Sequence, residues 1–447
     1  MRASHGPHRR RRVIDIRRIV GGGAAWPQRK MTRIVVIGGG VIGVTTAAEL
    51  ARRGLTVTLL ERSGTLGAGA TARNGGQLSY SYADALGSHG VLFDLPRLLC
   101  GLDPGFRIHV TLDPGFLIWV GRFLANCASA RFSANTLAVL RLALRSRSAL
   151  AALRARHPDL NFDHSNPGKL HLYDDAGKFE AAKEGMAFKN RFGCDQRALT
   201  VSQAVAIEPA VASWGRHIAG AIHSPIDEAG DPHGFTQSLA AIAVREYGLS
   251  ILTGMAVERF IVEGQRIRAV ETPRGLVEAD LFVLTAGTDA PALARTVEIG
   301  LPIYPLKGYS VTLPAAADAP LISITDARGR IVFCRLGKHV RIAGMADLGR
   351  PNRIIQRERI DLLMAAAQVC LPGAADWSAD PQSWTGLRPM TPDSRPIIGP
   401  TAIANLFLNC GHGMLGWTLA CGSAELAAAE IVGERQPMVD DFSLARF

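Results

Sequence analysis

The stretch RIVVIGGGVIGVTTAAELARRGLTVTLLER, residues 33–62, sets an apolar strand, a glycine-rich turn, a helix and a second strand in close succession. The run IVVI (34–37) contains no polar residue, which is typical of a strand buried on both faces of a parallel sheet. Gly54 follows the helical pattern at a position where helices commonly end. The stretch therefore predicts a β-α-β unit and an α/β fold.

The glycines of this stretch have the spacing of a dinucleotide-binding turn. Gly38, Gly40 and Gly43 form G-x-G-x-x-G, in which the first permits a tight turn, the second lets the backbone approach a pyrophosphate, and the third lets the helix pack on the strand. Glu61 ends the second strand, where a carboxylate accepts hydrogen bonds from ribose hydroxyls. An acid at this position disfavours a 2′-phosphate, so NADP is not expected.

Two later segments decide between FAD and NAD. The first is ATARNGGQLSYSY (70–82), and the second is EADLFVLTAGTDA (278–290), an apolar strand that ends in small residues. Their small residues allow the backbone to lie close to an extended ligand such as a flavin. Because they lie far apart in the chain, we expect a discontinuous, Rossmann-type FAD-binding domain.

The composition is that of an ordinary globular protein whose charge lies at one end. The chain has 447 residues, enough for two or more units, and 47% of them are hydrophobic. Residues 1–30 hold nine Lys and Arg and one acid, and so supply eight of the eleven net positive charges. The nearly neutral remainder gives little support for a nucleic-acid partner. We interpret residues 1–30 as a basic, disordered extension before a natural start at Met31; a transit peptide or a basic docking arm is the alternative.

Cysteine usage and hydropathy bear on the cellular location of the protein. The seven cysteines are scattered, without C-x-x-C or metal-ligand spacing, which favours a reducing, cytoplasmic environment and no metal site. No run of 18 apolar residues predicts a transmembrane helix. GFLIWVGRFLANCA (115–128) is apolar but short: we expect a buried helix, or alternatively a peripheral contact with the inner face of the cytoplasmic membrane.

A proline-rich segment near the end of the chain places Arg388 between a leucine and a proline. WTGLRPMTPDSRPIIGP (384–400) contains Arg388 and four prolines after it. Proline fixes φ and removes a backbone donor, so we expect a rigid, irregular segment rather than a helix.

Several blocks resemble the FAD-dependent D-amino-acid dehydrogenase family, within the glycine oxidase and D-amino-acid oxidase fold group. They are residues 31–62, ARNGGQ (72–77), GRHIAGAIHSPIDEAGDPHGFT (215–236), YPLKGYSVTLP (304–314), WTGLRPMTPDSRPIIGPT (384–401) and NLFLNCGHGMLGWTLACGSAELAA (405–428). The resemblance runs from about Met31 to the C-terminus. Cys410, where the family often has a hydroxyl residue, and Arg73, where a small residue is common, depart from the pattern.

The resemblance implies a reaction. A D-amino acid would give up a hydride from Cα to flavin N5, its imino acid would hydrolyse to a 2-oxo acid and ammonia, and a quinone or other respiratory acceptor would take the electrons. The same blocks fit a dehydrogenase or oxidase of a cyclic or N-methyl amine such as D-hydroxyproline, sarcosine or glycine. A different class of function is a non-catalytic FAD-binding subunit of a larger complex.

Hydride transfer needs orientation more than acid–base groups, and the resemblance assigns that task to few residues. Arg388 would clamp the substrate carboxylate through a two-pronged guanidinium; the alternative is a structural arginine paired with Asp393. Tyr309 could donate to the carboxylate and Lys307 could lie over the flavin, and both could equally be ordinary buried strand residues. We expect His412 to be structural rather than a base.

The expected cofactor contacts come from the turn, the small-residue segments and a helix start. CGHGMLGWTLACGSAELAAAEIVG (410–433) predicts a glycine turn that opens a long helix, whose N-terminus would stabilise the negative charge of a reduced flavin. Tyr80 and Tyr82 are expected near the pocket. The predicted contacts are Ile37, Gly38, Gly40, Val41, Ile42, Gly43, Glu61, Arg62, Asn74, Gly75, Gly76, Gln77, Val257, Ala286, Gly287, Gly411, Gly413, Leu415, Gly416, Trp417 and Thr418.

We expect the chain to alternate between two domains. Residues 31–95, 195–300 and 385–440 would form the FAD-binding domain. Residues 96–194 and 301–384 would form an α+β substrate domain with an antiparallel sheet and helices from 116–157 and 176–192. RIVFCRLG and KHVRIAGMA (330–346) predict a hairpin around Gly337 and Lys338.

Overall fold

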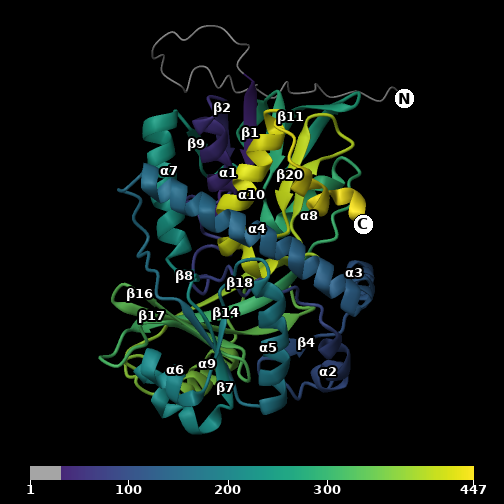
Figure 1. Ribbon diagram of the computed structural model, residues 1–447. Coiled ribbons are helices and arrows are strands. Elements are labelled where there is room, and N and C mark those ends of the chain that lie inside the picture. Colours follow the sequence, from purple (N-terminus) through teal and green to yellow (C-terminus); the bar gives the residue numbers. More distant parts are fainter. Residues whose placement is uncertain (1–31) are drawn as a thin grey trace, which may run out of the picture.

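The computed structural model describes residues 32–447, apart from the side chains of His89, Phe93, Asp94 and Arg216. It shows two stacked units, each built on one large sheet, with the long helix α4 (Ser129–Arg156) running diagonally across the front of the upper one (Figure 1). We name them the six-stranded unit and the nine-stranded unit after those sheets. The prediction for residues 1–30 lies outside the described residues.

The six-stranded unit is centred on residues 33–62, and the predicted β-α-β unit is confirmed. Strand β1 pairs in parallel with β2 on one side and with β13 on the other. Helix α1 (Val41–Arg52) connects β1 to β2. The sheet order is β19 (Ile397–Pro400), β20 (Leu406–Cys410), β13 (Leu281–Leu284), β1 (Arg33–Ile37), β2 (Thr56–Leu60) and β9 (Ser250–Leu252), and only the edge strand β19 is antiparallel to its neighbour.

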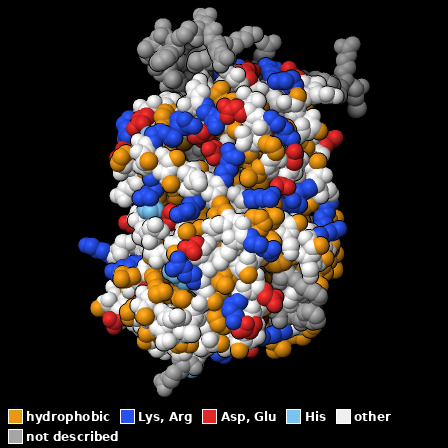
Figure 2. All heavy atoms as spheres, viewed as in Figure 1, with side chains coloured by type: hydrophobic (Ala, Val, Ile, Leu, Met, Phe, Trp, Pro, Cys, Tyr) orange, Lys and Arg blue, Asp and Glu red, His pale blue; other side chains and the backbone are white. Residues whose placement is uncertain are grey.

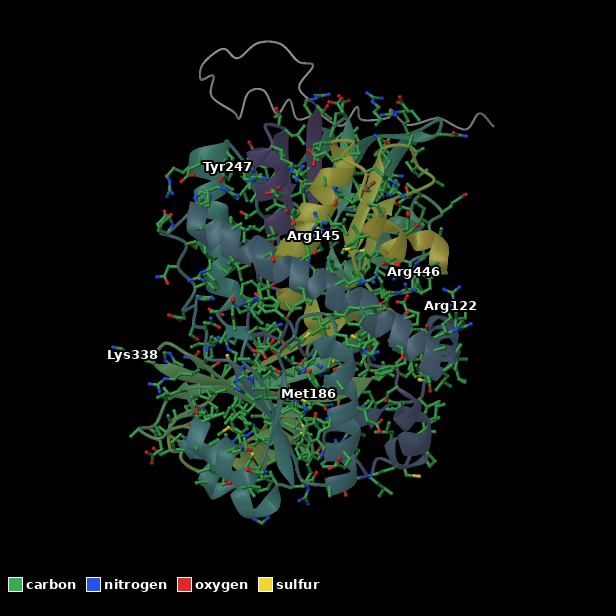
Figure 3. The ribbon with its side chains drawn as sticks, in the orientation of Figure 1. Arg122, Arg145, Met186, Tyr247, Lys338 and Arg446 are labelled. Atoms are coloured by element: carbon green, nitrogen blue, oxygen red, sulfur yellow. The ribbon has the colours of Figure 1, made fainter. Side chains whose placement is uncertain are left out.

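Helices cover one face of this sheet and a small sheet covers the other. The helical layer, in which Val44, Ala47 and Leu50 are fully buried, contains α1, α4, α7 (Pro232–Tyr247) and α10 (Gly416–Ile431). The other face packs against β10 (Arg259–Glu263), β11 (Arg266–Thr272), β12 (Gly275–Glu278) and α8 (Ala290–Arg295). Arg145 of α4, labelled in Figure 3, donates to Glu425 of α10 at 2.9 Å. Helix α4 therefore packs on the six-stranded unit, although its residues were expected in the substrate domain.

The nine-stranded unit is a mixed sheet with helices packed around it. Its order is β18 (Gln382–Met390), β14 (Tyr304–Pro314), β17 (His339–Leu348), β16 (Ile331–Leu336), β15 (Ser323–Asp326), β5 (Lys169–Tyr173), β7 (Gly220–Ser224) and β6 (Arg197–Leu199), with β4 (Phe106–Ile108) paired to β17. Helix α9 (Arg357–Cys370) packs on it through the buried Ile360, Leu363 and Ala367. The other helices are α2 (His89–Leu99), α3 (Pro114–Asn126), α5 (Ala176–Asn190) and α6 (Val201–Ile207). A two-stranded piece, β3 (Gln77–Leu78) with β8 (Glu228–Ala229), lies between the units.

Several expectations for this unit need correction. The sheet is not purely antiparallel, because β5 pairs with β15 and β4 with β17 in parallel. Residues 384–390 are not irregular: they belong to β18, where Pro389 lies opposite Pro305 in an edge strand, a position at which the missing N–H is tolerated. Strands β6 and β7, from the segment expected in the FAD domain, pair in the nine-stranded sheet. The range 116–157 holds two helices, α3 and α4.

The predicted hairpin is confirmed. Leu336 pairs with His339 across the turn, and Gly337 has a φ of 57°, which a glycine adopts without strain. Lys338 projects from its tip (Figure 3). All seven cysteines are free, and all but Cys100 are buried. Within residues 32–447, none of the helices combines the length and apolar character that crossing a membrane requires.

Candidate active site

A single long cavity of about 940 Å³ connects the two units, at the upper end of the size usual for ligand sites. Its lining begins at the glycine turn after β1 and ends at Arg388 and the inner face of the nine-stranded sheet. One ligand in this cavity would therefore touch both units.

The glycine turn has the geometry that its spacing predicts. Gly38 has a φ of 110°, and a Cβ there would lie 2.9 Å from the Thr285 carbonyl oxygen. A Cβ on Gly43 would lie 1.7 Å from the Gly38 carbonyl oxygen, so the third glycine is what lets α1 approach β1. The first turn of α1 then lines the cavity through Val41 and Ile42. Helix starts present free N–H groups, which suits a pyrophosphate.

Glu61 lies at the end of β2 on the cavity wall. One carboxylate oxygen accepts from the Gly39 N–H at 2.6 Å and the other accepts from the Ser63 N–H at 2.8 Å. These bonds hold the carboxylate beside the glycine turn, where the ribose of a dinucleotide would lie. Arg62 also lines the cavity and forms an ion pair with Asp289 at 2.6 Å.

Residues 73–82 cross the inner face of the nine-stranded sheet. The Arg73 carbonyl accepts from Ser310 of β14 at 2.9 Å, and the Gln77 amide donates to the Ile324 carbonyl at 3.3 Å. Further along, Ser79 accepts from Lys169 of β5 at 3.0 Å. Tyr82 lines the cavity, whereas Tyr80 turns away from it toward Glu228. The segment is thus fixed to the sheet at three points and closes one side of the cavity.

The start of α10 meets the cavity from the other side. Residues 413–418 line it, and Thr418 accepts from the Ser79 N–H at 3.0 Å. His412, just before this turn, is hydrogen-bonded to Ser423 at 3.1 Å. Burial lowers the pKa of His412 to about 3, so the ring is neutral near pH 7. This arrangement agrees with a structural histidine rather than a base.

Arg388 lies on β18 beside Gly308 of β14, and its side chain is partly exposed in the cavity. No hydrogen bond or ion pair joins its guanidinium to any residue of the described chain, and burial lowers its pKa only to about 10, so it stays charged. Asp393, the alternative partner, is engaged by Arg395 at 3.1 Å and Arg446 at 2.6 Å. Arg388 is therefore a cation that faces the cavity without a counter-charge.

The structure does not bring Lys307 and the Tyr309 hydroxyl to Arg388. The Lys307 ammonium donates to Asn352 at 2.9 Å, and Lys307 is not part of the cavity lining. Tyr309 contributes to the wall, but its hydroxyl donates to Asp347 at 2.7 Å on the α9 side of the sheet. Both side chains follow the alternation of β14, which turns every second residue away from the cavity.

The predicted cofactor contacts fall along this cavity, apart from Gly43 and Gly76. Gly43 packs against the Gly38 carbonyl, and Gly76 packs against Cys334 and Leu336 of β16. Sequence reasoning missed Lys169, His171 and Tyr173, which line the cavity from β5. The alternation KLHLY (169–173) was the available signal, since it marks a strand with one polar face. No group of His, Cys, Asp or Glu within residues 32–447 is arranged to hold a metal ion.

Comparison with known proteins identifies the family. The model of the FAD dependent oxidoreductase (DAO) family matches residues 33–430. The chain belongs to this family. Among curated relatives, D-amino acid dehydrogenase 2 of Ralstonia nicotianae is 39% identical over 93% of this chain and 100% of its own, and the D-amino acid dehydrogenase of Paramagnetospirillum magneticum is 38% identical over 93% and 99%.

Solved structures show the same fold at lower identity. Glycine oxidase from Geobacillus kaustophilus aligns with a TM-score of 0.74 and 22% identity over 93% of this chain and 100% of its own. L-proline dehydrogenase from P. horikoshii aligns with a TM-score of 0.72 and 21% identity over 94% and 98%. The Rossmann-type sheet with a second α+β unit is thus the fold of the family.

FAD is the cofactor of this family, and the cavity fits it. The glycine turn, where a Cβ would clash, suits the pyrophosphate, and the Glu61 carboxylate beside it suits the ribose. The start of α10 suits the flavin.

Proposed function

We propose that this protein is an FAD-dependent dehydrogenase that oxidatively deaminates D-amino acids. The observation that carries the proposal is the unpaired Arg388 guanidinium in the cavity, because an α-amino acid always offers a carboxylate to such a group. The relatives named D-amino acid dehydrogenase, which match nearly the whole chain, support a D-amino acid as substrate. In this proposal the six-stranded unit is the FAD-binding domain and the nine-stranded unit is the substrate domain.

Arg388 would hold the substrate by its carboxylate and so fix the position of Cα. Its guanidinium lies directly over Gly308, where a Cβ would be only 2.4 Å from a guanidinium nitrogen. Gly308 therefore gives the arginine its space, and the β14–β18 pairing keeps both backbones in place. A bidentate clamp on a strand limits rotation as well as translation, which is what a hydride donor requires.

A bound FAD would supply the hydride acceptor for the substrate Cα. The chain supplies the surroundings: the N-terminus of α10 stabilises negative charge, and residues 73–82 close the cavity on one side. His412 is neutral and bonded to Ser423, so the substrate amine would lose its proton to water and not to this ring. The imino acid then hydrolyses to a 2-oxo acid and ammonia. In this proposal Tyr309 and Lys307 support the strand and do not contact substrate.

Anaerobic flavin reduction tests the proposal. The purified holoprotein should lose its yellow colour with D-alanine and keep it with L-alanine. A panel of sarcosine, glycine and D-hydroxyproline tests the cyclic and N-methyl amines on the same preparation. Bleaching by both alanine enantiomers at equal rates, or by secondary amines alone, would refute D-amino-acid specificity. FAD that no amine reduces would point instead to a non-catalytic subunit.

We further propose that a quinone accepts the electrons and that the protein works at the inner face of the cytoplasmic membrane. Apolar side chains are exposed together on the loop before α3 and on α3 itself, and Leu112 is 88% and Ile118 59% exposed. Figure 2 shows orange side chains at the right-hand side of the molecule, at the level of α3. Arg122, also on α3, is exposed and suits anionic headgroups.

Vesicle binding tests this surface. Cosedimentation with vesicles that contain anionic lipid should be lost in Leu112→Asp/Ile118→Asp, together with reduction of a membrane-embedded quinone. Leu321→Asp is the matched control, because Leu321 is 67% exposed on a different segment. Equal sedimentation of all three proteins would contradict the membrane contact, and electron transfer to oxygen alone would contradict the quinone.

A further inference from the structure

The edge strand β18 presents a row of residues to the cavity. Residues two apart on a strand share a face, and Trp384, Gly386 and Arg388 all line the cavity. The Trp384 indole lies over Gly386, where a Cβ would be 2.0 Å from a ring carbon. Gly386 pairs directly with Gly308, over which the Arg388 guanidinium lies. The indole and the guanidinium therefore lie next to each other above a floor of two glycines.

Arg73 stands at the other end of this row. Its guanidinium donates to the side chain of Gln382, the first residue of β18, at 2.6 Å, and Arg73 lines the cavity. Its backbone is fixed to the sheet, because the Arg73 carbonyl accepts from Ser310, the partner of Trp384 on β14. Gln382 is an even number of residues from Trp384 and Arg388, so it belongs to the same face. The two arginines thus stand at the ends of the row, with the indole between them.

Neither arginine of the row has a counter-charge. Arg73 is bonded to a neutral amide and, like Arg388, forms no ion pair with any residue of the described chain. Two other arginines that line the cavity are paired with acids: Arg62 with Asp289 at 2.6 Å and Arg330 with Asp103 at 3.2 Å. The row therefore holds two cations that only a ligand can neutralise.

A third cation adds to the positive charge at this end of the cavity. Arg353, on the loop 349–356, lines the cavity and has no carboxylate partner in the described chain. The acids of the lining lie elsewhere: Glu61, Glu258 and Asp289 in the six-stranded unit, and Asp326 at the end of β15. An amino acid with a neutral side chain has no net charge as a zwitterion. Three cations without acids favour a substrate with a net negative charge.

The distance between the two arginines of the row fits a dicarboxylate. Gln382 and Gly386 are four residues apart, so the two guanidinium groups lie about 13 Å apart along the strand. In extended D-glutamate the two carboxylate carbons lie about 5 Å apart, and a guanidinium carbon lies about 4 Å from the carboxylate carbon that it binds. D-glutamate with an arginine at each end therefore spans about 13 Å as well. Its two methylene groups would lie on the Trp384 indole.

We propose that Arg73 binds the side-chain carboxylate of an acidic D-amino acid, so that the enzyme selects D-glutamate over neutral substrates of the same shape. Arg388 holds the α-carboxylate, Arg73 holds the side-chain carboxylate, and Trp384 supports the carbon chain between them. The subsite rests on the proposed function, because it presupposes a D-amino acid held at Arg388. Its basis is geometric: two cations without counter-charge at the ends of one row of residues.

The isosteric pair D-glutamate and D-glutamine tests the subsite. We expect kcat/KM for D-glutamate to exceed that for D-glutamine about 10- to 100-fold, because the amide forms no charged pair with Arg73. Arg73→Gln, which removes the charge and keeps a polar side chain, should reduce this ratio about tenfold, mainly through KM for D-glutamate. Arg335→Gln is the control: Arg335 lies on β16 outside the cavity lining, so its ratio should match the wild type. Flavin absorbance checks that each variant holds FAD.

Charge reversal tests the same contact independently. In Arg73→Glu a carboxylate replaces the guanidinium, so the ratio of kcat/KM for D-lysine to that for D-glutamine should rise about tenfold above the wild-type ratio. D-glutamate should become a poorer substrate of this variant than D-glutamine. An unchanged D-lysine ratio would show that the substrate side chain does not reach residue 73.

The outcomes separate the subsite from the proposed function. An active enzyme that uses D-glutamate no better than D-glutamine, or an Arg73→Gln variant that slows both substrates alike, would overturn the subsite and leave D-amino-acid oxidation standing. Flavin that no D-amino acid reduces would remove the function, and the subsite with it. Should Arg73→Gln not fold, the wild-type ratio and Arg73→Glu still decide.

Discussion

Two arginines on opposite sides of the nine-stranded sheet, Arg359 and Arg388, have opposite surroundings. On the face toward α9, the closed face, Tyr309 donates to Asp347 at 2.7 Å, and Asp347 pairs with the fully buried Arg359 at 3.0 Å. On the face toward the cavity, the open face, the Arg388 guanidinium has no hydrogen-bond or ion-pair partner among the described residues. Strand β14 supports both faces. The buried Arg359 with its counter-charge therefore belongs to the architecture of this protein, and the Arg388 charge without one marks the binding surface.

The largest expected effect is on the closed face. Asp347→Ala should lower the free energy of unfolding by about 3–5 kcal/mol, because it leaves Arg359 buried without its counter-charge. Urea denaturation of the holoprotein measures this. Asp361→Ala is the control, since Asp361 forms only an exposed pair with Arg357 and should cost less than about 1 kcal/mol. Equal losses of stability in the two variants would contradict the special role of the buried pair.

Arg388→Lys should show the reverse pattern on the open face. Lysine keeps the charge but loses the fork, so we expect kcat/KM to fall about 100-fold while FAD stays bound and stability changes by less than about 1 kcal/mol. Steady-state kinetics with D-alanine, flavin absorbance and thermal unfolding measure the three quantities. Arg335→Lys, on β16 outside the cavity lining, should leave kcat/KM unchanged. A large loss of stability in Arg388→Lys would make this arginine structural.

A third effect is a pH dependence of the protein's stability that arises from His412. Its pKa is about 3 in the folded protein and about 6.5 when unfolded, so the unfolded chain alone takes up the proton between these values. The contribution of His412 to the free energy of unfolding is fully present above pH 6.5. It decreases by about 1.4 kcal/mol for each pH unit below that value. Below pH 6.5 the wild type should therefore lose stability relative to His412→Gln. A constant difference from pH 7 to pH 5 would show that the folded ring also takes up the proton.

The smallest effect sharpens the assignment of Tyr309. Tyr309→Phe removes a hydroxyl bonded to Asp347, so stability should fall by about 1 kcal/mol and KM for D-alanine should change less than threefold. If KM instead rises tenfold or more without loss of stability, the hydroxyl contacts the substrate carboxylate and the closed face contributes to binding.

Local sequence pattern predicted the six-stranded unit well. The turn, helix and strands of residues 33–62 are contiguous, so spacing alone fixes Gly38, Gly43 and Glu61 in place, and the structure shows each of them where the pattern requires. The glycine turn before α10 was predictable for the same reason.

The open face was predictable only in part. Arg388 stood out because it lies between apolar residues in a proline-rich segment, but its strand, β18, pairs with β14 from a distant part of the chain. Lys307 and Tyr309 were placed near the substrate because the sequence shows their strand, but not which of its faces meets the cavity.

The central claim is that the unpaired Arg388 holds a substrate carboxylate, and ligand binding without turnover tests it most directly. Propionate has the carboxylate and carbon chain of alanine but no amine to oxidise, and its binding can be followed through the flavin spectrum. The account predicts that the Kd for propionate rises at least tenfold in Arg388→Leu holoprotein relative to wild type, because a charge-assisted hydrogen bond is lost. Equal Kd values in the two proteins would contradict it.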